Sequence, residues 1–86
     1  MKFHATLTHT PESCPAAQSG QRTVSDWPAR AKEVGVELIA AVVCPPDHTQ
    51  FFVVETDDFS KLAELFRPLY GFAKADISPV EDLMTR

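Results

Sequence analysis

Alternation of apolar and polar residues along the chain predicts four β-strands. Residues 2–8 alternate with a period of two, so that Phe3, Ala5 and Leu7 share one face of a strand. Three further segments are bounded by turn residues and are either strongly apolar or alternating. They comprise residues 36–44, 50–56 and 72–78. Such segments are typical of strands that contribute to a core.

Two segments with helical spacing lie between these strands. The first begins near Ser25, has Pro28 in its first turn and ends at Gly35, residues that suit those positions of a helix. The second begins after Asp57 or Asp58, either of which can serve as the N-cap. The apolar stripe of this second helix comprises Phe59, Leu62, Leu65, Phe66 and Leu69.

The resulting order, β-α-β-β-α-β, predicts an α+β protein with a ferredoxin-like fold. In this fold the four strands form an antiparallel sheet in the order 4-1-3-2, and both helices cover one face. We expect residues 1–78 to form a single ferredoxin-like domain, since a chain of 86 residues supports only one core. Residues 79–86 are expected to form a polar C-terminal tail.

The second and third predicted strands are apolar on both faces. Strict alternation groups their side chains as Leu38, Ala40 and Val42 against Ile39, Ala41 and Val43, and as Phe51 and Val53 against Phe52 and Val54. Exposure of such side chains forfeits roughly 1.5–3 kcal/mol each relative to burial. We therefore expect the face without helices to pack on a second subunit, in a homodimer or a larger assembly.

This pattern resembles the dimeric α/β-barrel group, in which two such sheets pack face to face around a shared cavity. The stretches HTPESCP (residues 9–15) and GVELIAAVVCPPDHTQFFVVE (residues 35–55) are also similar to small uncharacterised bacterial members of that group. The resemblance implies a dimer with an internal cavity. The group includes isomerases, small cofactor-free monooxygenases and metal-binding members. No catalytic motif of a named enzyme family can be matched to this chain residue by residue.

Four potential metal ligands are predicted to meet at one edge of the sheet. They are His9, Cys14, Cys44 and His48. Because the first two strands run parallel, their ends and the turn that follows the second strand share this edge. A Cys/His quartet suits tetrahedral zinc, and also nickel or copper. The alternative is that Cys44 is a buried residue at a strand end and that the other three are ordinary loop residues.

A second candidate site is the cavity expected between subunits. The polar side of the first strand and the neighbouring fourth strand supply His4, Thr6, Thr8, Lys74 and Asp76. His4 could act as a general base, since the free pKa of histidine lies near neutrality. Tyr70 could present its hydroxyl at the cavity mouth. The alternatives are a solvated or hydrogen-bonded His4 and a capping or packing role for Tyr70.

Composition and charge indicate which classes of partner the protein lacks and in which compartment it is expected. The net charge is −4 and no Lys/Arg cluster is present, which argues against binding to nucleic acid. No apolar run approaches the roughly 20 residues that span a membrane, and the N-terminus lacks the apolar core of a signal peptide. We therefore expect a cytoplasmic protein. In that reducing compartment the two cysteines are expected as free thiols or ligands rather than as a disulfide.

These observations favour a small cytoplasmic homodimeric binding protein for a transition-metal ion or a small ligand. The alternative is a cofactor-independent monooxygenase or isomerase that acts on a small organic substrate in the inter-subunit cavity, with His4 as base. A further alternative is a structural assembly module. The Cys/His quartet favours the first hypothesis, whereas an apolar cavity with one histidine favours the second.

Overall fold

The computed structural model describes residues 1–9, 26–70 and 73–84. Within these residues the chain forms four strands and two α-helices in the order β-α-β-β-α-β. The elements are β1 (Lys2–His9), α1 (Trp27–Val34), β2 (Glu37–Cys44), the 3-10 turn η1 (Pro45–Asp47), β3 (Thr49–Glu55), α2 (Phe59–Phe66), the 3-10 turn η2 (Arg67–Leu69) and β4 (Ala73–Val80). The predicted α+β class is confirmed.

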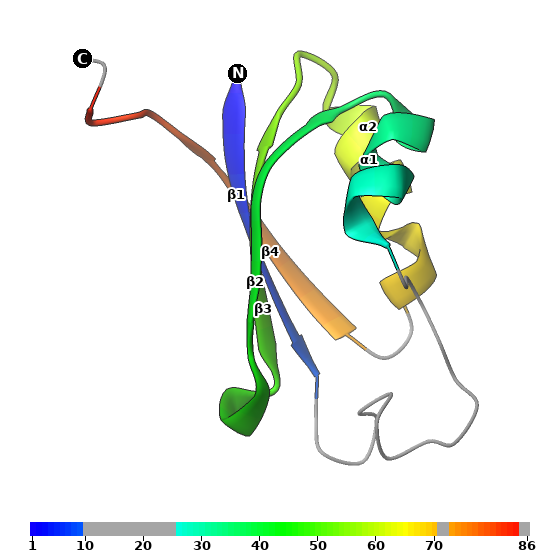
Figure 1. The fold of residues 1–86 in the computed structure, drawn as a ribbon, viewed down its shortest axis with the longest axis vertical. Coiled ribbons are helices and arrows are strands. Elements are labelled where there is room, and N and C mark those ends of the chain that lie inside the picture. Colours follow the sequence, from blue (N-terminus) through cyan, green and yellow to red (C-terminus); the bar gives the residue numbers. More distant parts are fainter. Residues whose placement is uncertain (10–25, 71–72, 85–86) are drawn as a thin grey trace.

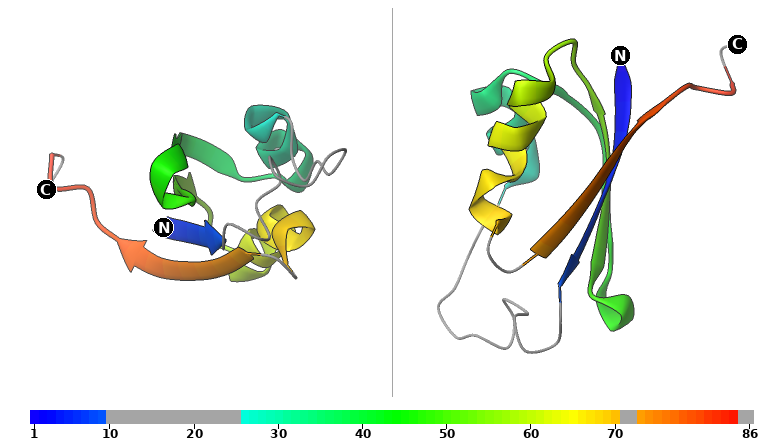
Figure 2. Two further views of the ribbon diagram at one scale, coloured as in Figure 1. Left: turned by 90° about the horizontal axis from the view of Figure 1, so that it is seen from below. Right: turned by 180° about the vertical axis from the view of Figure 1, so that it is seen from behind.

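The strands form one sheet in the order β2-β3-β1-β4, and every neighbouring pair is antiparallel. This is the predicted order 4-1-3-2, compatible with a ferredoxin-like fold. Both helices lie on the same side of the sheet, as the views from the front, from below and from behind all show (Figures 1 and 2). The opposite side carries no helix, and we call it the helix-free face.

The core lies between the helices and the sheet. On β1 the side chains of Phe3, Ala5 and Leu7 are buried, as alternation predicts. Opposite them on β3, Phe3 pairs with Val54 and Ala5 pairs with Phe52. These pairs are directly opposite one another, so their side chains share the helix-covered side of the sheet.

Three aromatic rings connect both helices to the sheet. The ring centroids of Trp27 and Phe52 are 4.6 Å apart, those of Phe52 and Phe66 are 5.2 Å apart, and those of Trp27 and Phe66 are 5.9 Å apart. The rings come from α1, β3 and α2, and each pair is tilted rather than stacked face to face. Such pairs contribute about 0.5–1.5 kcal/mol beyond the burial of their area. This aromatic cluster therefore joins three elements that are distant in sequence.

Helix α1 begins one residue later than the sequence pattern indicated. Its N-cap is Asp26, whose carboxylate accepts a hydrogen bond from the Ala29 amide at 3.1 Å. Ser25, the predicted cap, lies outside the described residues. Pro28 occupies the first turn and Gly35 ends the helix in the left-handed conformation, with φ of 92°. Both of those predictions are confirmed.

Helix α2 presents its predicted apolar stripe to the sheet. Leu62, Leu65 and Phe66 are fully buried, and Leu69 continues the stripe into η2. Phe59 exposes 57% of its surface, although its ring contacts Phe3 edge to face with centroids 5.8 Å apart. The helix therefore buries its central turns and exposes its first residue.

A bulge interrupts the pairing of β2 with β3. Leu38 pairs with Val54, and the next residue of β3, Val53, pairs with Ala40, so Ile39 is an extra residue in β2. A bulge of this kind changes the face on which the following side chains lie.

The bulge corrects the predicted assignment of faces. Leu38 shares the helix-covered side with Ala41 and Val43, while Ala40, Val42 and Cys44 face the helix-free side. The prediction that Leu38 shares a face with Ala40 and Val42 is therefore wrong. The physical reason is the one additional residue, which strict alternation does not anticipate.

Most of β2 is exposed in the single chain. Helix α1 has eight residues and is shorter than this strand, in which Leu38 alone is half-buried and the other side chains are exposed. Val42 and Val43, on opposite faces, expose 61% and 57% of their surfaces. The two-sided apolar character predicted for this strand thus forms an exposed apolar surface.

Strand β4 continues to Val80, two residues into the segment expected as a polar tail. It curves away from the helices towards the C-terminus (Figures 1 and 2). No helix in the described part of the chain is long and apolar enough to cross a membrane.

Replacement of Gly35 by Ala is expected to destabilise the fold by about 1–2 kcal/mol, the cost of the left-handed conformation for a residue with a Cβ atom. The cause is the backbone rather than crowding, because the added Cβ would meet only Lys61 Nζ at 3.4 Å. Gly35→Asn should cost less, since Asn tolerates this conformation. Urea unfolding followed by circular dichroism measures both variants, and equal stability of Gly35→Ala and wild type would contradict the prediction.

Acid should weaken the N-terminus of α2 through Asp58. Its carboxylate accepts bonds from the Ser60 hydroxyl at 2.6 Å and the Ser60 amide at 3.0 Å, and these bonds lower the pKa of Asp58 below 3.8. This contribution to stability is present above pH 3.8 and is lost as the pH falls through the lowered pKa. Asp58→Asn keeps the cap but does not titrate. The stability of wild type relative to Asp58→Asn should therefore fall with acidification, and a constant difference would refute this role.

Candidate functional site

Two histidines meet at the end of the sheet where β1 ends and β2 turns into β3. His9 Nε2 and His48 Nδ1 are 3.3 Å apart, and the two rings lie edge to face with centroids 5.1 Å apart. The His9 amide also donates a hydrogen bond to the His48 carbonyl at 3.2 Å. The topology therefore brings together two of the four predicted metal ligands, as the sequence indicated.

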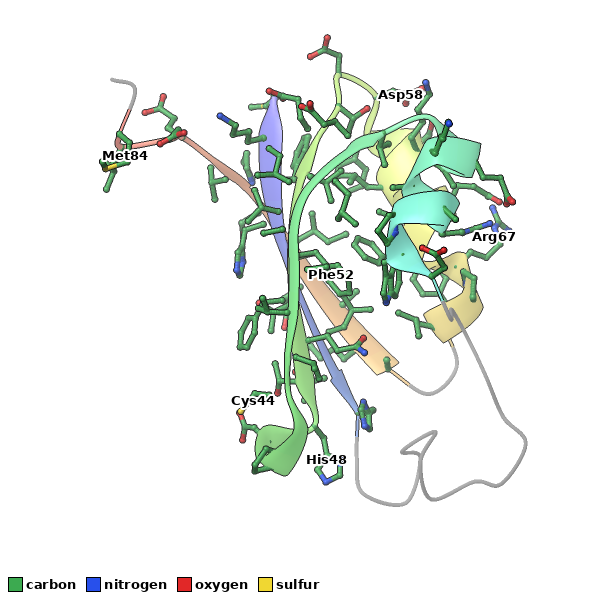
Figure 3. The ribbon with its side chains drawn as sticks, in the orientation of Figure 1. Cys44, His48, Phe52, Asp58, Arg67 and Met84 are labelled. Carbon is green, nitrogen blue, oxygen red and sulfur yellow. The ribbon has the colours of Figure 1, made fainter. Side chains whose placement is uncertain are left out.

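The turn that carries His48 is held in an unusual backbone conformation. His48 has a φ of 51°, in the left-handed region that non-glycine residues seldom adopt. The neighbouring Thr49 is buried, and its hydroxyl donates to the Asp47 carbonyl at 2.9 Å. The left-handed conformation of His48 and the hydrogen bond of Thr49 fix the direction in which the His48 side chain leaves the turn (Figure 3).

The surroundings of the His9 imidazole favour its neutral form over its protonated form. Burial lowers the pKa of His9 below 6.5, and the charge of His48 beside it lowers that pKa further. A neutral ring can donate a hydrogen bond from one nitrogen and accept one at the other. The 3.3 Å contact between the two rings is then a hydrogen bond that one imidazole donates to the other.

Cys44 does not join the two histidines. It pairs with Thr49 on the helix-free side of the sheet, while His9 pairs with Ala73 on the helix-covered side. Figure 3 shows the Cys44 side chain on the side of β2 that faces away from the helices, with His48 on the other side of the turn. The thiol is free and exposed, so it is not the buried strand-end residue considered above.

The quartet is thus not assembled in the described part of the chain. Cys14 lies outside the described residues. Among the residues that the structure describes, no three His, Cys, Asp or Glu side chains gather closely enough to hold a metal ion together. The physical reason for the separation of Cys44 is the bulge at Ile39, which turns the end of β2 over.

The helix-free face is divided into an apolar half and a polar half. The apolar half, on β2 and β3, has Ala40, Val42, Phe51 and Val53 at its centre, with Cys44 and Thr49 at one end and Glu37 and Glu55 at the other. The polar half, on β1 and β4, contains His4, Thr6, Thr8, Lys74, Asp76 and Ser78, and ends at Lys2 and Val80. The ring of His4 lies beside that of Phe51, with centroids 6.2 Å apart, at the boundary between the halves.

Five of the six predicted cavity residues lie on this polar half. Thr6 pairs with Asp76 and Thr8 pairs with Lys74 across β1 and β4, and His4 is next to them on β1. The Lys74 ammonium and the Asp76 carboxylate are 3.9 Å apart on the exposed surface. Tyr70 does not join them, because it follows η2 in the helix layer, where half of its surface is exposed.

Two neighbours of His4 on this face were not predicted as part of the cavity site. Ser78 pairs directly with His4, and Phe51 contacts the His4 ring. The alternation of residues 72–78 places Ser78 on the same face as Lys74 and Asp76, so this signal was present in the sequence. The contact between Phe51 and His4 depends on strand register, which the sequence pattern did not specify.

A shallow apolar depression lies on the helix-covered side beside β2. It has a volume of about 150 Å³ and is lined by Trp27, Ala41, Val42, Val43, Gln50 and Phe52. No ionisable group lines this depression in the described residues, so it offers shape and apolar surface but no acid–base chemistry.

Protonation of His9 should destabilise the fold. Because the folded protein lowers the pKa of His9, the stability that His9 contributes is present above pH 6.5 and is lost as the pH falls below that value. His9→Gln removes this titration. Unfolding in urea at about pH 8 and about pH 5 should therefore show a smaller loss for His9→Gln than for wild type. An equal loss in both proteins would mean that His9 is not perturbed.

Comparison with protein families extends over the whole sheet and both helices. A family model described as a domain of unknown function, DUF3303, matches residues 1–85 of this chain. No curated protein sequence matches the chain. The matched segment includes the histidine pair and every residue of the helix-free face. The chain therefore belongs to the DUF3303 family.

Proposed function

We propose that this protein is a small cytoplasmic homodimeric binding protein. In the proposed dimer the helix-free faces of two chains pack together, as in dimeric α/β barrels. The ligand is a small organic molecule or a transition-metal ion. The observation that carries the proposal is the helix-free face itself, which combines an exposed apolar half with a clustered polar half.

Burial of the apolar half would provide the free energy for association of two chains. Phe51 and Val53 are half-buried and Val42 is mostly exposed in the single chain, although all three are large apolar residues. Burial of such a side chain is favourable by roughly 1.5–3 kcal/mol. Sheets with one solvated face normally present polar side chains there. A second sheet packed on this face would remove the exposed apolar area from water.

The area of the face is sufficient for a specific dimer. Four strands about 4.8 Å apart, with seven or eight residues rising about 3.3 Å each, give a flat footprint of about 500 Å². Two chains together would bury about 1,000 Å² or more, which is the lower bound for a biological interface. An interface of this size is compatible with a specific dimer, and its affinity depends on how well the apolar side chains pack rather than on area alone.

The division of the face favours one orientation of the partner. A two-fold axis across the strands places the apolar half of one chain on the apolar half of the other. An axis along the strands would instead bury apolar side chains against Lys74 and Asp76. We therefore propose the first arrangement, in which the two polar halves also face each other and enclose a polar space.

That polar space is the proposed binding site for a small ligand. His4, Thr6 and Ser78 offer an imidazole and two hydroxyls, groups that both donate and accept hydrogen bonds. The Phe51 ring beside His4 offers a flat apolar wall. A small molecule with a polar end and an unsaturated or aromatic part suits this combination.

A second candidate function is catalysis in the same space. The contact of His4 with Phe51 places the one histidine of the helix-free face next to an apolar surface, where it could act as general base for an isomerase or a cofactor-independent monooxygenase. The binding role is preferred, because no second acid–base group of the described face contacts His4 in the single chain.

A cytoplasmic location agrees with the state of Cys44. This thiol is free and exposed at the end of β2. Exposed free thiols persist in reducing compartments, whereas secreted small domains generally pair their cysteines. We therefore propose a cytoplasmic location for the dimer.

Phe51→Asp is expected to convert the dimer to a folded monomer. The new charge would be buried at the proposed interface, whereas the helix-covered core does not include Phe51. Sedimentation equilibrium at micromolar concentration should give two chains per particle for wild type and one for the variant. The matched control is Phe59→Asp, which places the same charge on an exposed phenylalanine of the helix layer and should leave the assembly intact.

A wild-type monomer under these conditions would refute the proposed dimer and its shared polar space. Equal dissociation by Phe51→Asp and Phe59→Asp would instead mean that the interface is not confined to the helix-free face. Circular dichroism of both variants confirms that each remains folded before its mass is interpreted.

A further inference from the structure

Two of the three histidines in the chain form a pair that the proposed dimer does not use. His9 and His48 lie at the end of the sheet, and His9 faces the helix-covered side, away from the proposed interface. We propose that this pair binds one divalent transition-metal ion within each chain. The inference rests on the proposed binding function, which it makes specific, but not on the proposed dimer.

The separation of the two nitrogens matches that of two ligands on one ion. Imidazole nitrogens bind zinc at about 2.0–2.1 Å, and two such bonds at a tetrahedral angle place the nitrogens about 3.3–3.4 Å apart. His9 Nε2 and His48 Nδ1 are separated by 3.3 Å. An ion can therefore be bound by rotation of the rings, with no change in the distance between the two ligand atoms.

The backbone holds the two ligands in place. The bond from the His9 amide to the His48 carbonyl ties the end of β1 to the β2–β3 turn. The left-handed conformation of His48 and the buried Thr49 after it fix that turn. The site is thus built on a strand end and a tight turn, and metal binding would cost little additional chain ordering.

The hydrogen bond between the two rings is compatible with metal binding through the same two nitrogens. In the contact between the rings one nitrogen donates a hydrogen bond from its N–H group and the other nitrogen accepts that bond. A neutral ring that binds metal through one nitrogen carries its proton on the other. Binding therefore requires only that the donating ring move its proton to its second nitrogen, and that the ion take the place of the hydrogen bond.

The described residues supply two ligands and leave the other positions of the ion open. No third His, Cys, Asp or Glu of the described chain lies close enough to complete the cluster. Water or an external ligand would fill these positions, as in open metal sites. Imidazole pairs suit copper, nickel and zinc, and the general order of affinity places copper above nickel and zinc.

The direct test is titration of the chelator-treated, full-length chain with Ni²⁺ and, separately, Zn²⁺ by isothermal calorimetry. His9→Gln and His48→Asn should each weaken binding by at least roughly tenfold, since even loss of a group that only supports a ligand costs about 10–100-fold. Asn is chosen at His48 because it tolerates a left-handed conformation. One ion per chain is the expected stoichiometry.

Two control variants separate this site from its competitors. His4→Gln removes the third histidine, on the opposite face of the sheet, and should leave the affinity unchanged. Cys44→Ser removes the exposed thiol at the end of β2 and should also bind as wild type does. Loss of binding in either control, with His9→Gln unaffected, would overturn the assignment.

A second measurement identifies the histidines that bind the ion in the wild-type protein. In the proton NMR spectrum of wild type, paramagnetic Ni²⁺ should broaden the ring signals of His9 and His48 before those of His4. Broadening that begins at His4, or no saturable binding of either ion, would overturn the proposal. The Phe51→Asp chain keeps both ligands, so metal binding by that variant separates failure of the dimer from failure of the metal site.

Discussion

The packing of Trp27 against Phe52 and Phe66 is the interaction on which the two different faces of the sheet depend. These rings attach α1 and α2 to the same side of β3, and they do so near the centre of the sheet. Because both helices are committed to that side, the other side of the sheet has no cover from the described chain. The exposure of the helix-free face follows from this one-sided arrangement, and the association and ligand binding that we propose would both take place on that face.

The fold was predictable because local signals and topology agree. Alternation along β1 identified its buried face, and Pro28, Gly35 and Asp58 sit where helix starts and stops require them. The bulge at Ile39 was not predictable. In an unbroken apolar run, one extra residue changes no pattern of apolar and polar positions, since only backbone pairing distinguishes its neighbours.

The candidate sites were predictable only as far as topology reaches. Parallel directions of β1 and β2 placed His9 and His48 at a common edge, and the structure brings their rings into contact. The same reasoning placed Cys44 at this edge. Cys44 is at the edge, but the bulge puts its side chain on the face opposite to that of His9. The neighbours of His4 required strand register, which depends on the β2–β3 turn rather than on any motif.

The bulge also changes the exposed edge of the sheet. Strand β2 is at the edge of the sheet, and after Glu37 it contains neither a charged residue nor a proline. Edge strands with such composition invite further strands to add, and charges or prolines usually prevent this. Here the extra residue twists the edge and breaks the even spacing of its free amides and carbonyls. The bulge at Ile39 therefore makes this edge a poorer template for a further strand, an effect that edge strands more often obtain from a charged side chain.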